Sequence, residues 1–115
     1  MLFLGTEKYP EENHYARYIA AGGGNKNAAT SEDYTQYYFD IKNEMLEHAL
    51  DIFSHFFKTP KFTESATERE LNAVDAEFRK NLSNEARRLH QIVKSEITVE
   101  NCPLKRFSTG NLESL

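Results

Sequence analysis

The sequence predicts an α+β fold in which helices pack on a mostly antiparallel sheet. Two stretches, over about 43–58 and about 66–95, repeat apolar residues at helical spacing. A third stretch, Tyr34 to Ile41, alternates side chains with the period of a half-buried strand. The length of 115 residues allows one domain at most, so these elements must share a small core.

The composition excludes several classes of function. The 14 basic and 18 acidic side chains give a net charge of −4, so the chain has no basic patch for nucleic acid or an anionic membrane surface. An apolar content of 39% is too high for a disordered chain, and no apolar run is long enough to span a membrane. Cys102 is the single cysteine and cannot form an internal disulfide, which favours a reducing compartment.

The first forty residues predict a helix followed by a hairpin. Pro10 suits the first position of a helix over about 10–21, and Gly22-Gly23-Gly24 ends that helix. Residues 25–30 then pair with 34–41 across the loop Ser31-Glu32-Asp33. A phosphate-binding loop is rejected for the three glycines, because no strand precedes them.

Three further helical segments follow. The helix over about 43–58 has a broad apolar stripe and ends before Pro60. Ser65-Ala-Thr-Glu68 has the capping-box pattern, so we expect the next helix to begin near 66. A break at 81–84 and a continuation to about 95 complete the helices, and the last twenty residues read as loop.

Two carboxylates on the helix from 66 are candidates for chemistry. Glu70 and Glu77 are seven residues apart and share one side of that helix, at the border of its apolar face. Border carboxylates can reach into a cleft and bind a metal. A pair of solvated acids near Arg69 or Lys80 is the simpler alternative, and the spacing leaves both open.

The pair Glu44 and His48 imitates a zinc-binding helix but lacks its ligands. A zinc-binding helix carries ligands four residues apart, at i and i+4, and this stretch has His only at the second of these positions. A catalytic zinc usually takes three protein ligands, mostly His. His55 lies beside the apolar stripe, where packing is the expected role, and Cys102 is expected to be a free structural thiol.

Several blocks resemble the insulinase (pitrilysin) family of zinc metallopeptidases. The matching blocks run almost from end to end: Met1-Leu-Phe-Leu-Gly-Thr-Glu-Lys-Tyr-Pro-Glu-Glu-Asn13, Gly24-Asn-Lys-Asn-Ala-Ala-Thr30, Tyr37-Tyr-Phe-Asp40, Ala49-Leu-Asp-Ile-Phe53, Arg69-Glu-Leu-Asn-Ala-Val-Asp-Ala-Glu77 and Phe107-Ser-Thr-Gly-Asn111. The resemblance implies that residues 1–115 are a fragment of one insulinase-type N-terminal peptidase domain, with helices packed on a mostly antiparallel sheet.

The resemblance also implies roles for individual residues. Glu77 matches the family's third zinc ligand, and Glu70 matches an outer acid that steadies the ligands. The family adds an extended peptide to an edge strand, and the residues that match this strand are Asn27, Ala28 and Thr30. Phe3 matches a residue that lines the site. Ala29 replaces a usually bulky residue, so we expect a wider neighbouring pocket.

The family's His-x-x-Glu-His motif, with two zinc ligands and the general base, would lie directly before Met1. We therefore expect the isolated chain neither to bind Zn²⁺ tightly nor to cut peptides. The parent activity implied is zinc-dependent endopeptidase action on small extended peptides, in a cytoplasmic protein or, with a presequence, a mitochondrial one. The alternative is a non-catalytic module that binds peptides or a partner.

Overall fold

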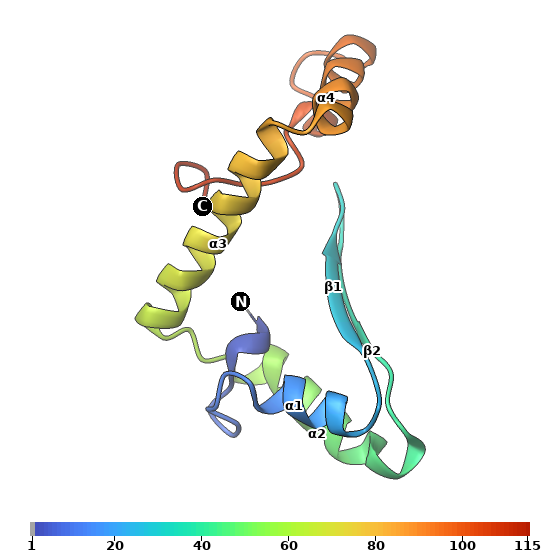
Figure 1. The fold of residues 1–115 in the computed structure, drawn as a ribbon, viewed down its shortest axis with the longest axis vertical. Helices are drawn as coiled ribbons and strands as arrows, with labels where there is room; N and C mark the ends of the chain where they lie inside the picture. Colours follow the sequence, from blue (N-terminus) through green and yellow to red (C-terminus); the bar gives the residue numbers. More distant parts are fainter. Residues whose placement is uncertain (1) are drawn as a thin grey trace. The chain divides into compact units, whose positions relative to one another are not determined.

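The computed structural model describes residues 2–115 and divides them between two compact units. Unit 1 comprises residues up to Thr30 together with Tyr34–Thr67, and unit 2 comprises Ser31–Asp33 and Glu68–Leu115. The helices and the two-stranded sheet confirm the α+β prediction (Figure 1). No helix within residues 2–115 is long and apolar enough to cross a membrane. That 1–115 form part of one larger domain stays a prediction.

Unit 1 begins with the short 3₁₀ helix η1 (Leu2–Leu4) and a tight turn that delays the first α-helix. The Thr6 N–H donates to the Tyr9 carbonyl at 2.9 Å, and the Tyr9 N–H donates to Thr6 Oγ1 at 3.0 Å. Pro10 therefore follows a turn, and α1 (His14–Ala21) begins four residues later than the sequence predicts. Placing Pro10 at the first helical position was wrong, because the N–H and the carbonyl of the preceding Tyr9 are already bonded within this turn.

The three glycines end α1, as expected. The Gly24 N–H donates to the Ile19 carbonyl at 3.0 Å, and Gly23 has a left-handed φ of 69°. A Cβ on Gly24 would lie 1.9 Å from the Asp40 carbonyl oxygen, so only glycine allows the end of α1 to approach the end of the hairpin this closely.

The predicted hairpin is present. Strands β1 (Lys26–Thr30) and β2 (Thr35–Phe39) pair antiparallel, with Ala28 opposite Tyr37 and Lys26 opposite Phe39. Tyr37 and Phe39 share one face of the ribbon, where Tyr37 contacts Phe57 and Phe39 contacts Phe53. The hairpin thus packs on the next helix through this aromatic face.

The core of unit 1 lies between α1 and α2 (Leu46–Lys58), which follows the 3₁₀ turn η2 (Asn43–Met45). Five side chains, each at most 2% exposed, form the core: Tyr15, Ile19, Ala49, Ile52 and Phe56. The rest of the apolar stripe of α2 stays open, with Leu50 49% and Phe57 56% exposed. One hairpin covers only part of a stripe this broad.

Helix α3 (Glu64–Leu82) begins two residues earlier than predicted. Thr63 is the capping residue: its carbonyl accepts from the Thr67 N–H at 2.9 Å, and its hydroxyl accepts from the Ala66 N–H at 3.4 Å. The prediction of a capping box at Ser65–Glu68 was therefore wrong, because the hydroxyl of Thr63 caps the helix two residues earlier.

Unit 2 contains the main part of α3, then α4 (Glu85–Ile97) and the 3₁₀ turn η3 (Pro103–Lys105). The predicted break between the helices is confirmed: Asn84 caps α4 by accepting from the Arg87 N–H at 3.0 Å. Lys94 is 7% exposed and donates to the Arg106 carbonyl at 3.1 Å and to Glu32 at 2.9 Å.

Candidate functional site

The two carboxylates predicted from the sequence lie on one side of α3, within unit 2. Seven residues correspond to nearly two full turns, so Glu70 and Glu77 are only about 20° apart around the helix axis. Glu77 is exposed, and among the described residues it forms no hydrogen bond or ion pair. Its carboxylate is therefore available to a group outside these residues.

The neighbouring side of α3 is covered by the segment 107–112. The ring of Phe78 meets that of Phe107 at a centroid distance of 5.5 Å, and Asn81 Nδ2 donates to Thr109 Oγ1 at 2.7 Å. Asp75 Oδ1 accepts from the Leu112 N–H at 3.3 Å. This packing leaves Glu77 exposed, whereas Glu70 is half-buried.

The donor chemistry of Glu77 suits one ligand position of a zinc site, since zinc accepts carboxylate oxygens alongside His and Cys. No group of three His, Cys, Asp or Glu side chains within residues 2–115 has the geometry to hold a metal ion. Glu77 therefore fits as a single donor, and the described residues do not form a complete zinc site.

The candidate peptide-binding residues lie on β1, in unit 1. The Asp40 N–H donates to the Asn25 carbonyl at 2.9 Å, which sets the alternation of the ladder. Because bonded and non-bonded pairs alternate in an antiparallel ribbon, the continuous register makes Asn27 and Ala29 bond to β2. Ala28 and Thr30 then direct their backbone N–H and C=O groups away from β2.

The outer edge of β1 is thus unpaired within the described residues. The side-chain carbonyl of Asn27 accepts from the Ala28 N–H at 2.9 Å, which partly masks the edge. All three predicted edge residues are exposed. An extended peptide that adds to this edge would meet the Ala28 carbonyl and both backbone groups of Thr30.

Phe3 is a half-buried part of the aromatic packing of unit 1. Its ring lies 5.5 Å from that of Tyr15, 5.3 Å from that of Phe56 and 5.5 Å from that of Tyr37, centroid to centroid. Lys26 Nζ lies 4.8 Å from the centre of the Phe3 ring. Phe3 therefore touches the face of the hairpin, and its role in lining a site stays a prediction.

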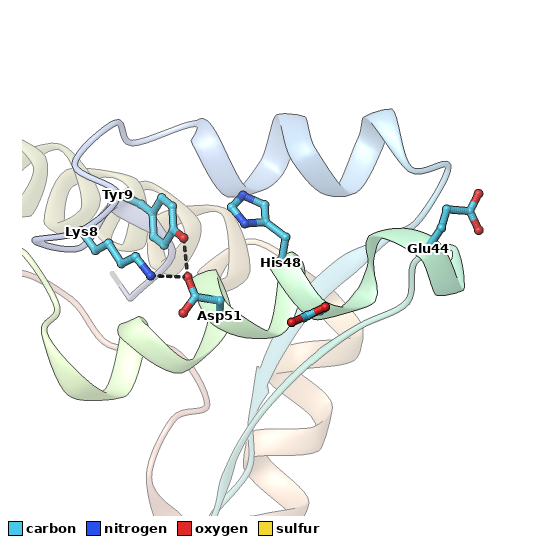
Figure 2. Close-up of a pocket in the computed structure, with 6 residues that line it drawn as sticks. Lys8, Tyr9, Glu44, His48 and Asp51 are labelled. Atoms are coloured by element: carbon cyan, nitrogen blue, oxygen red, sulfur yellow. Dashed lines mark hydrogen bonds and ion pairs between the residues drawn. The ribbon is translucent and has the colours of Figure 1, made fainter.

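The rejected pair Glu44 and His48 does not come together. Figure 2 shows Glu44 directed away from His48, although both line one surface pocket of about 450 Å³. The His48 ring packs on Tyr18 at 4.8 Å and on Tyr9 at 5.7 Å. His55 is also packed, with its ring 5.9 Å from that of Tyr9. Both histidines are aromatic packing partners.

The same pocket contains an anchor that the sequence did not reveal. Asp51 on α2 accepts hydrogen bonds from Lys8 Nζ, at 2.7 Å, and from the Tyr9 hydroxyl (Figure 2). These two donors lower the pKa of the Asp51 carboxyl to about 2, and the same bonds raise the pKa of Lys8 and of Tyr9. More than forty residues separate the partners, so no local pattern points to the contact.

Comparison with known proteins defines first the class and then the family. Over its whole length the chain is 49% identical to human insulin-degrading enzyme and 44% identical to the A-factor-processing enzyme of Saccharomyces cerevisiae. The fold matches a crystal structure of pitrilysin with a TM-score of 0.80 and 33% identity over 99% of the chain. The chain thus shares its sequence and fold with a class of enzymes, two of which are named for degrading or processing a peptide.

A family model for Insulinase (Peptidase family M16) matches residues 1–103, and the chain belongs to this family. The fold also matches an inactive M16 peptidase domain from Pseudomonas fluorescens, with a TM-score of 0.76 and 20% identity over 99% of this chain and 28% of the chain in that structure. The chain spans about 11% of the length of the human and yeast relatives and 12% of the pitrilysin chain.

Proposed function

We propose that these residues serve a zinc-dependent metalloendopeptidase that degrades small extended peptides, with Glu77 as one ligand of Zn²⁺ and Glu70 as an outer acid that steadies it. The observation that carries the proposal is the exposed Glu77 carboxylate, which forms no hydrogen bond or ion pair among the described residues. Membership of the insulinase family supports it.

The substrate would bind by strand addition. The backbone groups of Ala28 and Thr30 face the open edge of β1, with Asn27 beside them, and main-chain hydrogen bonds of this kind select an extended conformation. Side chains beside the edge are small, which suits a varied peptide sequence. Phe3 would contribute an apolar surface next to this strand.

Zinc, when bound, would polarise the scissile carbonyl and lower the pKa of its water to about 7. Within this chain Glu77 would supply one negatively charged donor, and because the described residues hold no group of three donors, the set would be completed by residues outside 2–115. We therefore propose that the isolated chain is inactive.

A chimera tests the proposal. The matching segment of human insulin-degrading enzyme is replaced by this chain, which aligns along its full length. The chimera should bind one zinc and hydrolyse peptide, whereas the isolated chain should do neither. Glu77→Gln keeps the shape of the side chain but removes the anionic donor, so zinc occupancy and activity should both collapse.

Two further variants of the chimera separate the role of Glu77 from those of its neighbours on α3. Glu70→Gln should have a milder effect, since outer partners of metal ligands contribute about 10–100-fold. Glu68→Gln is the matched control, because Glu68 is exposed about 160° around α3 from Glu70. Full zinc occupancy and normal activity in Glu77→Gln would overturn the ligand assignment.

A second function is open to the chain on its own, because its β1 edge is unpaired while the described residues lack a complete metal site. In that case the chain would act as a non-catalytic module that binds peptides or a partner protein. Saturable binding of an unstructured peptide by the isolated chain, abolished by Ala28→Pro, would favour the module.

We propose a cytoplasmic location for the parent enzyme; one relative is named as peroxisomal.

A further inference from the structure

The segment 107–112 lies against α3 close to Glu77. Three contacts of different kinds join it to the helix: the Asp75 carboxylate with the Leu112 N–H, the edge-to-face rings of Phe78 and Phe107, and the Asn81 amide with the Thr109 hydroxyl. All these residues belong to unit 2. The contacts fall at two residues before Glu77 and at one and four residues after it.

The contact of Asn81 leads directly to Glu77. In an α-helix the N–H of residue 81 donates to the carbonyl of residue 77, and both lie within α3. The side chain of the same Asn81 is 8% exposed and donates to Thr109 at 2.7 Å. One residue therefore connects the backbone of Glu77 to the segment 107–112.

Asp75 secures the other end of the same stretch. Its carboxylate is 13% exposed and is held by Arg79 Nε at 2.7 Å, so its second oxygen is directed at the Leu112 N–H. A purely apolar contact would bury this helix face with less demand on geometry, whereas polar groups bonded at both ends fix rotation about the helix axis and position along it.

We propose that the segment 107–112 is a brace that holds the Glu77 turn of α3 in place, with Asn81 and Thr109 as positioning residues for that carboxylate. The proposal rests on the role of Glu77 given above. Glu77 has no side-chain partner among the described residues, so its direction depends entirely on how firmly its helical turn is held.

The first measurement uses the full 115-residue chain. Thr109→Val keeps the volume of the side chain but removes the hydroxyl that accepts from Asn81. Amide exchange at 77–81 should become faster, while exchange at the Gly22 and Gly24 amides of unit 1 stays unchanged. Ser83→Ala is the control, because the Ser83 hydroxyl donates only to the Lys80 carbonyl and is exposed. Equal exchange at 77–81 in Thr109→Val and the wild type would overturn the brace.

The second measurement uses the chimera and titrates zinc against a chelator. Thr109→Val should weaken zinc binding about tenfold at an unchanged melting temperature, the lower end of the range for outer partners of metal ligands. Thr109→Ser keeps the hydroxyl and should restore the affinity. A zinc affinity in Thr109→Val equal to the wild type, or no recovery in Thr109→Ser, would overturn the positioning role.

Glu77→Gln separates the two proposals. If Glu77→Gln abolishes zinc binding and Thr109→Val leaves it intact, the brace fails and the proposed function stands. If Glu77→Gln leaves zinc binding intact, the proposed function fails and with it the purpose of the brace.

Discussion

Unit 1 and unit 2 bury their apolar residues to very different extents. In unit 1, α1 and α2 enclose side chains that are at most 2% exposed, and the aromatic rings of the hairpin pack on them. In unit 2, the apolar residues of α4 stay open, with Leu89 64% and Ile92 58% exposed. Unit 2 is held instead by polar contacts such as Asn81 with Thr109 and by the single ring pair Phe78 and Phe107.

The difference shows that helical propensity and a packed core are separate requirements. Helix α4 is well capped and amphipathic, yet within unit 2 nothing covers its apolar side. We expect unit 1 to carry most of the stability of the isolated chain, and unit 2 to unfold more gradually.

The largest expected effect comes from truncating the core of unit 1. Phe56 is 1% exposed and contacts Phe3, Tyr15 and Phe53, so Phe56→Ala should lower the free energy of unfolding by about 3–5 kcal/mol. Ile92→Ala on α4 should change it by less than about 0.5 kcal/mol. Urea titration followed by circular dichroism measures both, and equal losses would remove the distinction between the units.

A second test adds one methyl group in each unit. Gly24→Ala would force Cβ to within 1.9 Å of a backbone oxygen, whereas Cβ at Gly110 would meet side-chain atoms of Leu115 and Ser114, at 3.2 Å or more. Gly24→Ala should therefore cost about 1–3 kcal/mol and shift the amide resonances of Asn25 and Asp40. Gly110→Ala should cost much less. A neutral Gly24→Ala would contradict the close approach of α1 and β2.

The third test concerns α4, where local structure contributes more than packing. Asn84→Ala removes the side chain that accepts from the Arg87 N–H, so it should cost about 1 kcal/mol and lower the helical signal. Asn72→Ala is the matched control, since Asn72 is exposed within α3 and alanine is the better helix former there. A loss in Asn72→Ala as large as in Asn84→Ala would argue against the cap.

The smallest effect is electrostatic and belongs to unit 1. The donors Lys8 and Tyr9 hold the pKa of Asp51 at about 2, below its ordinary 3.8. A carboxyl whose pKa is lower in the folded state stabilises the fold above its unfolded pKa, and that stability is lost as the pH falls from about 4 to about 2. Asp51→Asn should therefore show a shallower loss of stability over this range.

Glu47→Gln is the control for the acid titration, because Glu47 lines the same pocket and is exposed. Thermal melts at intervals between pH 5 and pH 2 provide the comparison. An acid dependence in Asp51→Asn as steep as in the wild type would contradict the anchoring role of that carboxylate.

Much of the local structure follows from short-range pattern. The alternation in 34–41, the three glycines and the breaks at Pro60 and Asn81–Asn84 predict the hairpin and the helix ends. Errors arose where two local signals competed. Pro10 and Ser65 are both residues that commonly begin a helix. Instead, a turn built on Thr6 comes just before Pro10, and Thr63 caps the helix two residues before Ser65.

Some features of the candidate site follow from local sequence pattern, and others depend on tertiary contacts. The sequence by itself determined that Glu70 and Glu77 share a side of one helix, because the helical period requires it, and that 25–41 form a ribbon. Only the tertiary structure decided that the outer edge of β1 belongs to Ala28 and Thr30, and that Thr109 accepts a hydrogen bond from Asn81, one turn after Glu77. It also decided that Lys8 and Tyr9 anchor on Asp51. The contacts of Thr109 and of Asp51 join residues 28 to 43 positions apart, and no local periodicity encodes a pairing over that distance.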